Sequence, residues 1–162
     1  MKDSVTVHMD ATPQQVWDVV SDITRTGEWS PETFEARWTR GSTGPEVGAW
    51  FKGHVRRSGR GPVTYWSLCR VTACEPGREF GFSVGAADQV INNWHYLIEP
   101  APGGGSDVTE SFRLEPSALT RVYWLLAGWI RGRYNRRNMQ QSLERIKAIV
   151  EASPSDGAPA GA

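Results

Sequence analysis

Residues 108–117 of the chain read VTESFRLEPS and join two different sequence patterns. In the first pattern, one face of a predicted strand is formed by Val108, Glu110, Phe112 and Leu114. This period of two is typical of a strand that buries one side. In the second pattern, Pro116 and Ser117 open a segment that we predict to be one long helix, ending at about Glu151. The stretch therefore predicts a last strand followed by a long C-terminal helix.

The period of two recurs upstream of this junction. We expect six further strands, at residues 4–8, 34–38, 49–55, 65–75, 80–84 and 94–98. Between the first two, Thr12, Pro13 and Gln15 form a capping-box pattern that predicts a helix, and a second short helical turn is expected to end at Trp29. Only the long C-terminal helix is large enough to cover the buried face of an antiparallel meander. The sequence thus predicts an α+β fold, a curved sheet of about seven strands wrapped around that helix.

Length and composition indicate one domain. The chain has 162 residues, of which 39% are hydrophobic and 22% charged. We expect a single ligand-binding domain over residues 1–151 and a disordered tail over 152–162, where small residues, proline and glycine prevail. The formal net charge of zero argues against nucleic acid as the main partner.

The expected cellular compartment depends on three observations: membrane-spanning segments, a signal peptide and paired cysteines are all missing from the sequence pattern. No apolar run approaches the roughly 18 residues of a membrane span, and the N-terminus lacks the apolar centre of a signal peptide. Cys69 and Cys74 share one predicted strand at an odd spacing, so we expect them on opposite faces and unpaired. Free thiols without an export signal favour the cytoplasm.

Five segments together resemble the START-like or SRPBCC superfamily. They are residues 9–22 (MDATPQQVWDVVSD), 27–31 (GEWSP), 47–53 (VGAWFKG), 75–80 (EPGREF) and 108–111 (VTES). The resemblance covers residues 3–151 and is greatest to the polyketide cyclase/dehydrase-like branch. It implies the helix-grip fold. The superfamily includes aromatase/cyclases, lipid carriers, hormone receptors and proteins that sequester toxic natural products, so the fold does not select one activity.

Cofactor chemistry has no support in the motifs. The sequence contains three histidines, no cysteine or histidine cluster with metal-ligand spacing, no G-x-S-x-G, and no glycine-rich loop between a strand and a helix. We therefore expect neither a metal nor another cofactor.

Glu110 is the sharpest candidate for chemistry. Its strand alternation places it on the buried face, and burial of an unpaired carboxyl raises the pKa. Such a carboxyl can act as a general acid or base on an enolisable polyketide. Arg70 is the expected counter-charge, if it points inward. The alternatives are a structural ion pair or a solvated strand end for Glu110, and the outer face for Arg70.

Eight tryptophans are a heavy load for this length and indicate either a thick core or a ligand cavity. The expected ligand-binding set is Trp29, Trp38, Phe51, Trp66, Arg70, Phe80, Phe82 and Trp94. The strand alternation leaves the face of Trp66 open. Tyr96 adds a hydroxyl that can hydrogen-bond a substrate oxygen or transfer a proton.

One face of the long helix favours a cavity. Gly128, Gly132 and Asn135 lie on the same helical face, and the two glycines leave volume unfilled. Close approach of the sheet explains them equally well. In the cavity interpretation Gly128 and Gly132 line the ligand site, and Asn135 directs a polar group at the ligand.

The opposite face of the helix is apolar at Val122, Leu126 and Ile130, which predicts either a homodimer contact or a hydrophobic lid. Our first interpretation of function is the enclosure of an aromatic or polyketide-like molecule, with assistance to its cyclisation or dehydration by Glu110, Tyr96 and Asn135. The second is a carrier or self-resistance protein that sequesters a small molecule without chemistry. The absence of a strong acid–base constellation favours the second, and the family resemblance favours the first.

Overall fold

The sequence folds as a sheet closed by a helix. The computed structural model describes residues 2–59, 61–86, 89–115 and 118–152, with side chains except at 57–59, 61–62 and 118–133. The elements are β1 (Lys2–Met9), α1 (Pro13–Ser21), the 3-10 turn η1 (Ile23–Arg25), α2 (Thr26–Trp29), β2 (Thr33–Thr39), β3 (Trp50–Gly59), β4 (Gly61–Glu75), β5 (Glu79–Ala86), β6 (Gln89–Pro100), β7 (Ser106–Leu114) and α3 (Ala118–Ala152). The predicted α+β fold is confirmed. The expected tail beyond residue 152 lies outside the described residues.

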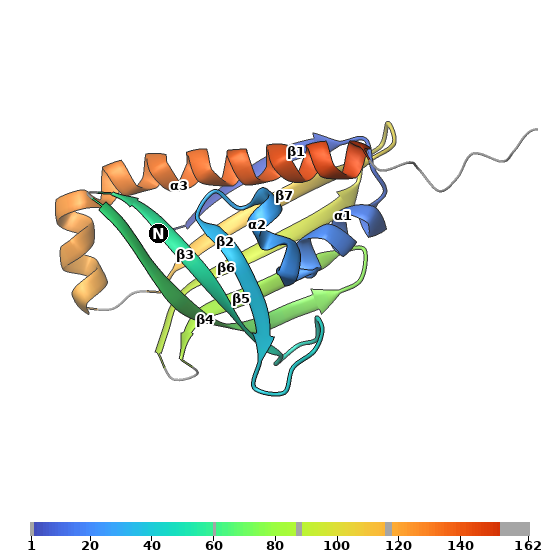
Figure 1. Cartoon of the computed structure of the whole chain (residues 1–162). Helices are drawn as coiled ribbons and strands as arrows, with labels where there is room; N and C mark the ends of the chain where they lie inside the picture. Colours follow the sequence, from blue (N-terminus) through green and yellow to red (C-terminus); the bar gives the residue numbers. More distant parts are fainter. Residues whose placement is uncertain (1, 60, 87–88, 116–117, 153–162) are drawn as a thin grey trace, which may run out of the picture.

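The seven strands form one antiparallel sheet in the order β1-β7-β6-β5-β4-β3-β2. The expected meander runs from β2 to β7, and β1 adds to its far edge by pairing with β7. Figure 1 shows the sheet curving around α3, with α1 and α2 beside the helix on the same side. This arrangement leaves the concave face of the sheet directed at α3.

The short helix α1 begins as its sequence predicts. The Thr12 side chain accepts a hydrogen bond from the backbone N–H of Gln15, and the Gln15 side chain accepts one from the backbone N–H of Thr12. At the other face of α1, the indole of Trp17 donates to the backbone carbonyl of Glu79 at 3.0 Å. The Trp17 bond fixes α1 against β5 and thereby positions the segment that follows the helix.

The core fills the space between α3 and one half of the sheet. The C-terminal half of α3 buries four side chains at helical spacing, namely Met139, Leu143, Ile146 and Val150. They pack in one cluster with Val5, Met9, Val108 and Ile98 from the strands of the β1 edge. Burial is thus densest at the β1–β7 end, where the helix clamps the sheet.

The structure contradicts the expectation that Cys69 and Cys74 lie on opposite faces of the sheet. The register of β4 against β5 shifts between Val71 and Ala73, so Cys74 faces Phe80 and lies on the same side of the sheet as Cys69. The odd spacing therefore does not separate them, because a bulge adds one residue. Both thiols are nevertheless free.

Candidate functional site

A cavity of about 380 Å³ lies between the concave face of the sheet and α3. Strands β2 to β7 all contribute to its walls, and η1, α2 and the loop at residues 30–32 form one side. Its volume falls in the range of roughly 300–1,000 Å³ typical of small-molecule sites. The apolar part of the lining includes Val20, Ile23, Trp29, Ala36, Phe51, Val55, Phe80, Phe82, Val84, Trp94, Phe112, Leu114 and Met139.

Glu110 and Tyr96 form a buried pair in this lining. The two residues face each other directly on β7 and β6, and they are 3% and 2% exposed. The Tyr96 hydroxyl donates to Oε1 of Glu110 at 2.9 Å. Cross-strand pairing thus brings together two polar groups that are 14 residues apart in the chain.

Burial is the largest cause of the pKa shifts of both groups. It raises the pKa of the Glu110 carboxyl to about 8, and the hydrogen bond from Tyr96 offsets part of this rise. Burial, and next the neighbouring Glu110, raise the pKa of the Tyr96 hydroxyl well above its ordinary value. Near neutral pH, Glu110 can therefore exist in both its acid and its carboxylate form.

The second oxygen of Glu110 is available to a ligand. Oε2 is buried and has no hydrogen-bond partner among the described residues. Because the Tyr96 hydroxyl donates to Oε1, the proton of the neutral acid belongs on Oε2. The acid form can donate this proton to a ligand oxygen, and the carboxylate form can accept a proton in its place.

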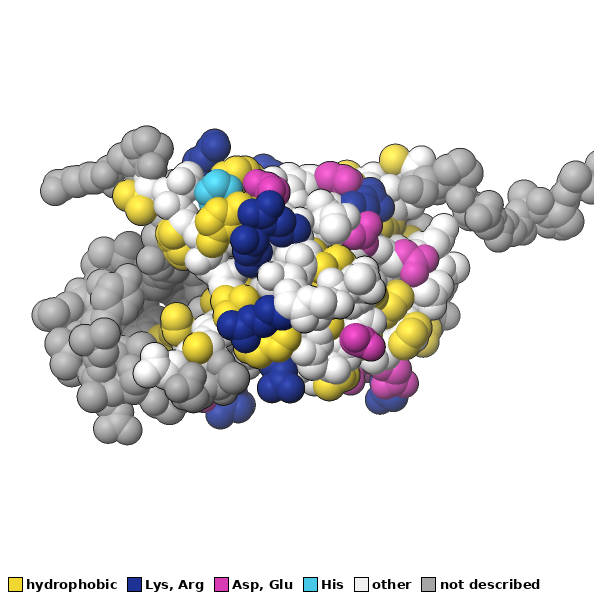
Figure 2. Space-filling view, turned by 60° about the horizontal axis from the view of Figure 1, so that its bottom comes forward, with side chains coloured by type: hydrophobic (Ala, Val, Ile, Leu, Met, Phe, Trp, Pro, Cys, Tyr) yellow, Lys and Arg dark blue, Asp and Glu magenta, His cyan; other side chains and the backbone are white. Residues whose placement is uncertain are grey.

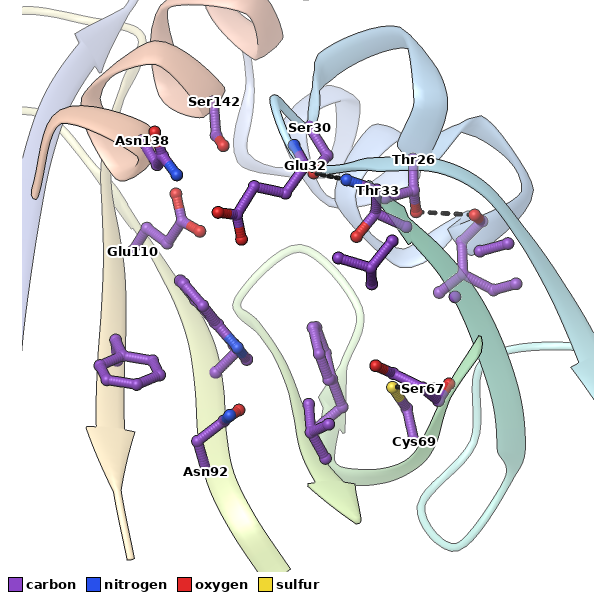
Figure 3. Close-up of a pocket in the computed structure, with 18 of the residues that line it drawn as sticks. Thr26, Ser30, Glu32, Thr33, Ser67, Cys69, Asn92, Glu110, Asn138 and Ser142 are labelled. Atoms are coloured by element: carbon purple, nitrogen blue, oxygen red, sulfur yellow. Dashed lines mark hydrogen bonds between the residues drawn. The ribbon is translucent and has the colours of Figure 1, made fainter. Parts of the chain in front are cut away.

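A second carboxyl, that of Glu32, enters the cavity from the loop between α2 and β2. Figure 3 shows it pointing toward the side of the cavity where Glu110, Asn138 and Ser142 lie. Sequence reasoning missed Glu32, because it follows a proline in a turn where no alternation assigns a face. Asn138 and Ser142 were missed as well, although their spacing from Asn135 on α3 places all three on one helical face.

Eight of the predicted site residues lie in the cavity lining: Glu110, Tyr96, Asn135, Trp29, Phe51, Phe80, Phe82 and Trp94. Trp38 does not. It packs edge-on against Phe51 at a centroid distance of 5.8 Å and belongs to the surrounding core. Gly128 and Gly132 lie in the part of α3 whose side chains are not described, as do Val122, Leu126 and Ile130.

Trp66 and Arg70 lie on the outer face of the sheet, so the expectation that they line the cavity is wrong. Cys69 faces inward, which turns Trp66 and Arg70 outward on the same strand. The ring of Trp66 stacks on His54 at 4.4 Å, and the guanidinium of Arg70 lies 5.7 Å from the Trp50 ring. Arg70 is therefore not the partner of Glu110.

Cations cover several aromatic rings of this outer face. The Trp66 ring has the Arg37 guanidinium at 4.6 Å and the Lys52 ammonium at 4.8 Å. In Figure 2, Lys and Arg side chains lie over hydrophobic ones on the face in view. Such contacts stabilise exposed aromatic side chains and account for Trp66 without a ligand.

Two further features are absent from the described ranges. There, no group of three or more His, Cys, Asp or Glu residues could hold a metal ion. None of the helices in this part of the chain combines the length and apolar character needed to cross a membrane.

The sequence matches one protein family, and the fold resembles those of many solved structures. Residues 2–151 match the family described as "Polyketide cyclase / dehydrase and lipid transport". A Corynebacterium glutamicum protein described as Polyketide_cyc-like is 31% identical, with a TM-score of 0.51, and the match covers 93% of this chain and 85% of that one. A Chromobacterium violaceum protein has a TM-score of 0.69 at 17% identity, covering 94% of this chain and 99% of that one. No curated protein matches the sequence.

Proposed function

Since the chain belongs to the family of polyketide cyclases, dehydrases and lipid-transport proteins, we propose that it encloses a hydrophobic, aromatic or polyketide-like molecule and exchanges a proton with it through Glu110. The observation that carries this proposal is the Glu110 carboxyl in the cavity wall. It is 3% exposed, and its Oε2 has no partner among the described residues. A carboxyl of this kind is costly to bury, which favours a role for it in the site.

The proposed proton exchange involves Glu110, Tyr96 and Asn135. In its acid form, Glu110 protonates a ligand carbonyl or a leaving hydroxyl from Oε2. In its carboxylate form, it removes a proton from the carbon next to a ketone. The Tyr96 hydroxyl positions the carboxyl through Oε1, and Asn135 contributes an amide to the same wall. Enclosure by the aromatic walls holds a flexible chain folded and keeps water from the reacting carbons.

Transport or sequestration without chemistry is the second candidate function. The largely apolar lining favours it, because a carrier needs enclosure and little else. Both candidates require the cavity to bind a hydrophobic molecule, and they differ in what Glu110 does after binding.

One experiment separates the two. The protein is incubated with candidate aromatic and polyketide ligands, while tryptophan quenching reports binding and chromatography reports product. Proton exchange predicts product, and in Glu110→Gln a turnover reduced by roughly 100-fold or more with binding retained. The matched control is Glu99→Gln, which alters an exposed carboxyl of β6. Binding without product supports the carrier, and turnover unchanged in Glu110→Gln removes Glu110 from the mechanism.

A further inference from the structure

The carboxyl of Glu32 has no hydrogen-bond or ion-pair partner among the residues that the structure describes. Its Oε1 is buried and makes no hydrogen bond to any described residue. None of the ion pairs between described residues includes Glu32. The backbone nevertheless fixes its position, because the Ser30 hydroxyl accepts hydrogen bonds from the N–H groups of Glu32 at 3.4 Å and of Thr33 at 2.9 Å.

The charged residues described in the cavity lining are all acidic. The described part of the lining includes two acids, Glu32 and Glu110, and no Lys, Arg or His. Glu32 is half-buried, and its buried Oε1 has neither solvent contact nor a positive partner among the described residues. Burying part of a charged group without such a partner is unfavourable. A positive charge on the occupant of the cavity would balance the buried oxygen of Glu32.

Two groups on α3 complete a polar end of the cavity beside Glu32. Asn138 and Ser142 are four residues apart and share one face of the helix. Figure 3 shows both side chains on the side of the cavity toward which the Glu32 carboxyl points. An ammonium group has three N–H donors and no acceptor, so a carboxylate, an amide oxygen and a hydroxyl oxygen can accept all three.

An independent observation points to an occupant with polar groups. Trp29 is 5% exposed and lines the cavity, yet its indole N–H has no partner among the described residues. An unpartnered buried donor costs stability unless something bound there accepts from it. The cavity thus presents acceptors at Glu32 and a donor at Trp29, on walls that are otherwise mostly apolar.

We infer that the ligand is a hydrophobic amine, whose protonated nitrogen binds the Glu32 carboxylate at the end of the cavity formed by Glu32, Asn138 and Ser142. Its apolar part occupies the aromatic walls beyond this end of the cavity, where Glu110 also lies. This inference rests on the proposed function, because it names the ligand class of the same cavity. It excludes fatty acids and other carboxylates as preferred ligands, since their negative group would lie beside the Glu32 carboxylate.

Three probes that share one ring system test the inference by isothermal titration calorimetry at pH 7. They are 2-naphthylmethylamine, 2-naphthalenemethanol and 2-naphthoate, which are cationic, neutral and anionic. The amine should bind at least about tenfold more tightly than the alcohol, a difference of about 1.4 kcal/mol at 25 °C. In Glu32→Gln this preference should disappear, while the alcohol keeps its affinity and naphthoate binds more tightly than to the unaltered protein.

Two further variants separate charge recognition from folding. Glu35→Gln makes the same change on β2, where the carboxyl lies 3.6 Å from the outer-face His54, and it should leave all three affinities unchanged. Glu32→Asp keeps the charge and should retain part of the amine preference. Retained binding of the alcohol by Glu32→Gln shows that the cavity is intact.

The outcomes distinguish this inference from the proposed function. If the alcohol binds and the amine has no advantage, or if Glu32→Gln keeps the advantage, the amine inference is overturned and the proposed function stands. If none of the three probes binds, the proposed function fails and the amine inference fails with it.

Discussion

At the residue scale, Glu110 couples the stability of the fold to pH. Its folded pKa of about 8 lies above the ordinary value of 4.5. Between these values the folded chain holds a proton that the unfolded chain releases. The contribution of Glu110 to stability is therefore complete below about pH 4.5 and declines as the pH rises toward 8.

Glu110→Gln removes this dependence. Relative to the unaltered protein, the variant should gain stability as the pH rises from 5 to 9, with a total gain on the order of 4 kcal/mol. Urea unfolding at pH 5, 7 and 9 measures the difference, with Glu99→Gln as the control for loss of a charge. A constant difference across this range would show that Glu110 is not protonated in the folded chain.

Tyr96→Phe affects the same carboxyl from the other side. It removes the hydrogen bond to Oε1, which leaves both oxygens of Glu110 without a partner among the described residues. We expect a loss of about 1–3 kcal/mol at pH 7. The pKa of Glu110 should also rise further, since the Tyr96 hydroxyl lowers it. Urea unfolding against pH tests both effects, and the control is Tyr65→Phe at an exposed tyrosine.

At the scale of elements, the close approach of α2 to β2 positions Trp29 and Glu32. A Cβ atom added at Gly27 would overlap the backbone carbonyl of Phe34. Gly27→Ala should therefore destabilise the fold by about 1–3 kcal/mol and weaken the binding of naphthalene probes. At Gly44 an added Cβ meets nothing within 4 Å, so Gly44→Ala is the matched control in thermal unfolding and calorimetry. Equal effects of the two variants would show that this contact does not shape the cavity.

The elements also show where sequence reasoning succeeds and where it stops. Regular alternation placed Glu110 and Phe112 in β7 on the buried face, because each has its neighbours at strict intervals of two. The same logic failed at Cys74, where a register shift adds one residue to β4. It left Trp66 open because both faces of β4 carry apolar residues. It found no role for Glu32, since the position of a loop side chain depends on tertiary contacts that periodicity does not encode.

At the scale of the whole molecule, an open cavity implies that ligand and fold support each other. A ligand that binds only the folded chain, at 100 times its dissociation constant, should raise the free energy of unfolding by about 2.7 kcal/mol. We predict this gain for 2-naphthalenemethanol in urea unfolding.

A variant with a filled cavity should lose that gain. Val84 lies in the lining, so Val84→Trp should abolish the stabilisation by the alcohol. Val63→Trp adds the same bulk at a position that is 61% exposed and should preserve it. Full stabilisation of Val84→Trp would place the binding site elsewhere.

Four of the described tryptophans fall into two optical classes. Trp29 and Trp94 face the cavity, whereas Trp50 and Trp66 lie on the outer face beneath cations. Iodide in the solvent is drawn to Arg37 and Lys52 and therefore quenches the emission of Trp66 first. A ligand bound in the cavity instead quenches the emission of Trp29 and Trp94. The protein thus carries its own internal reference, in which the outer fluorophores monitor the solvent while the inner ones monitor occupancy.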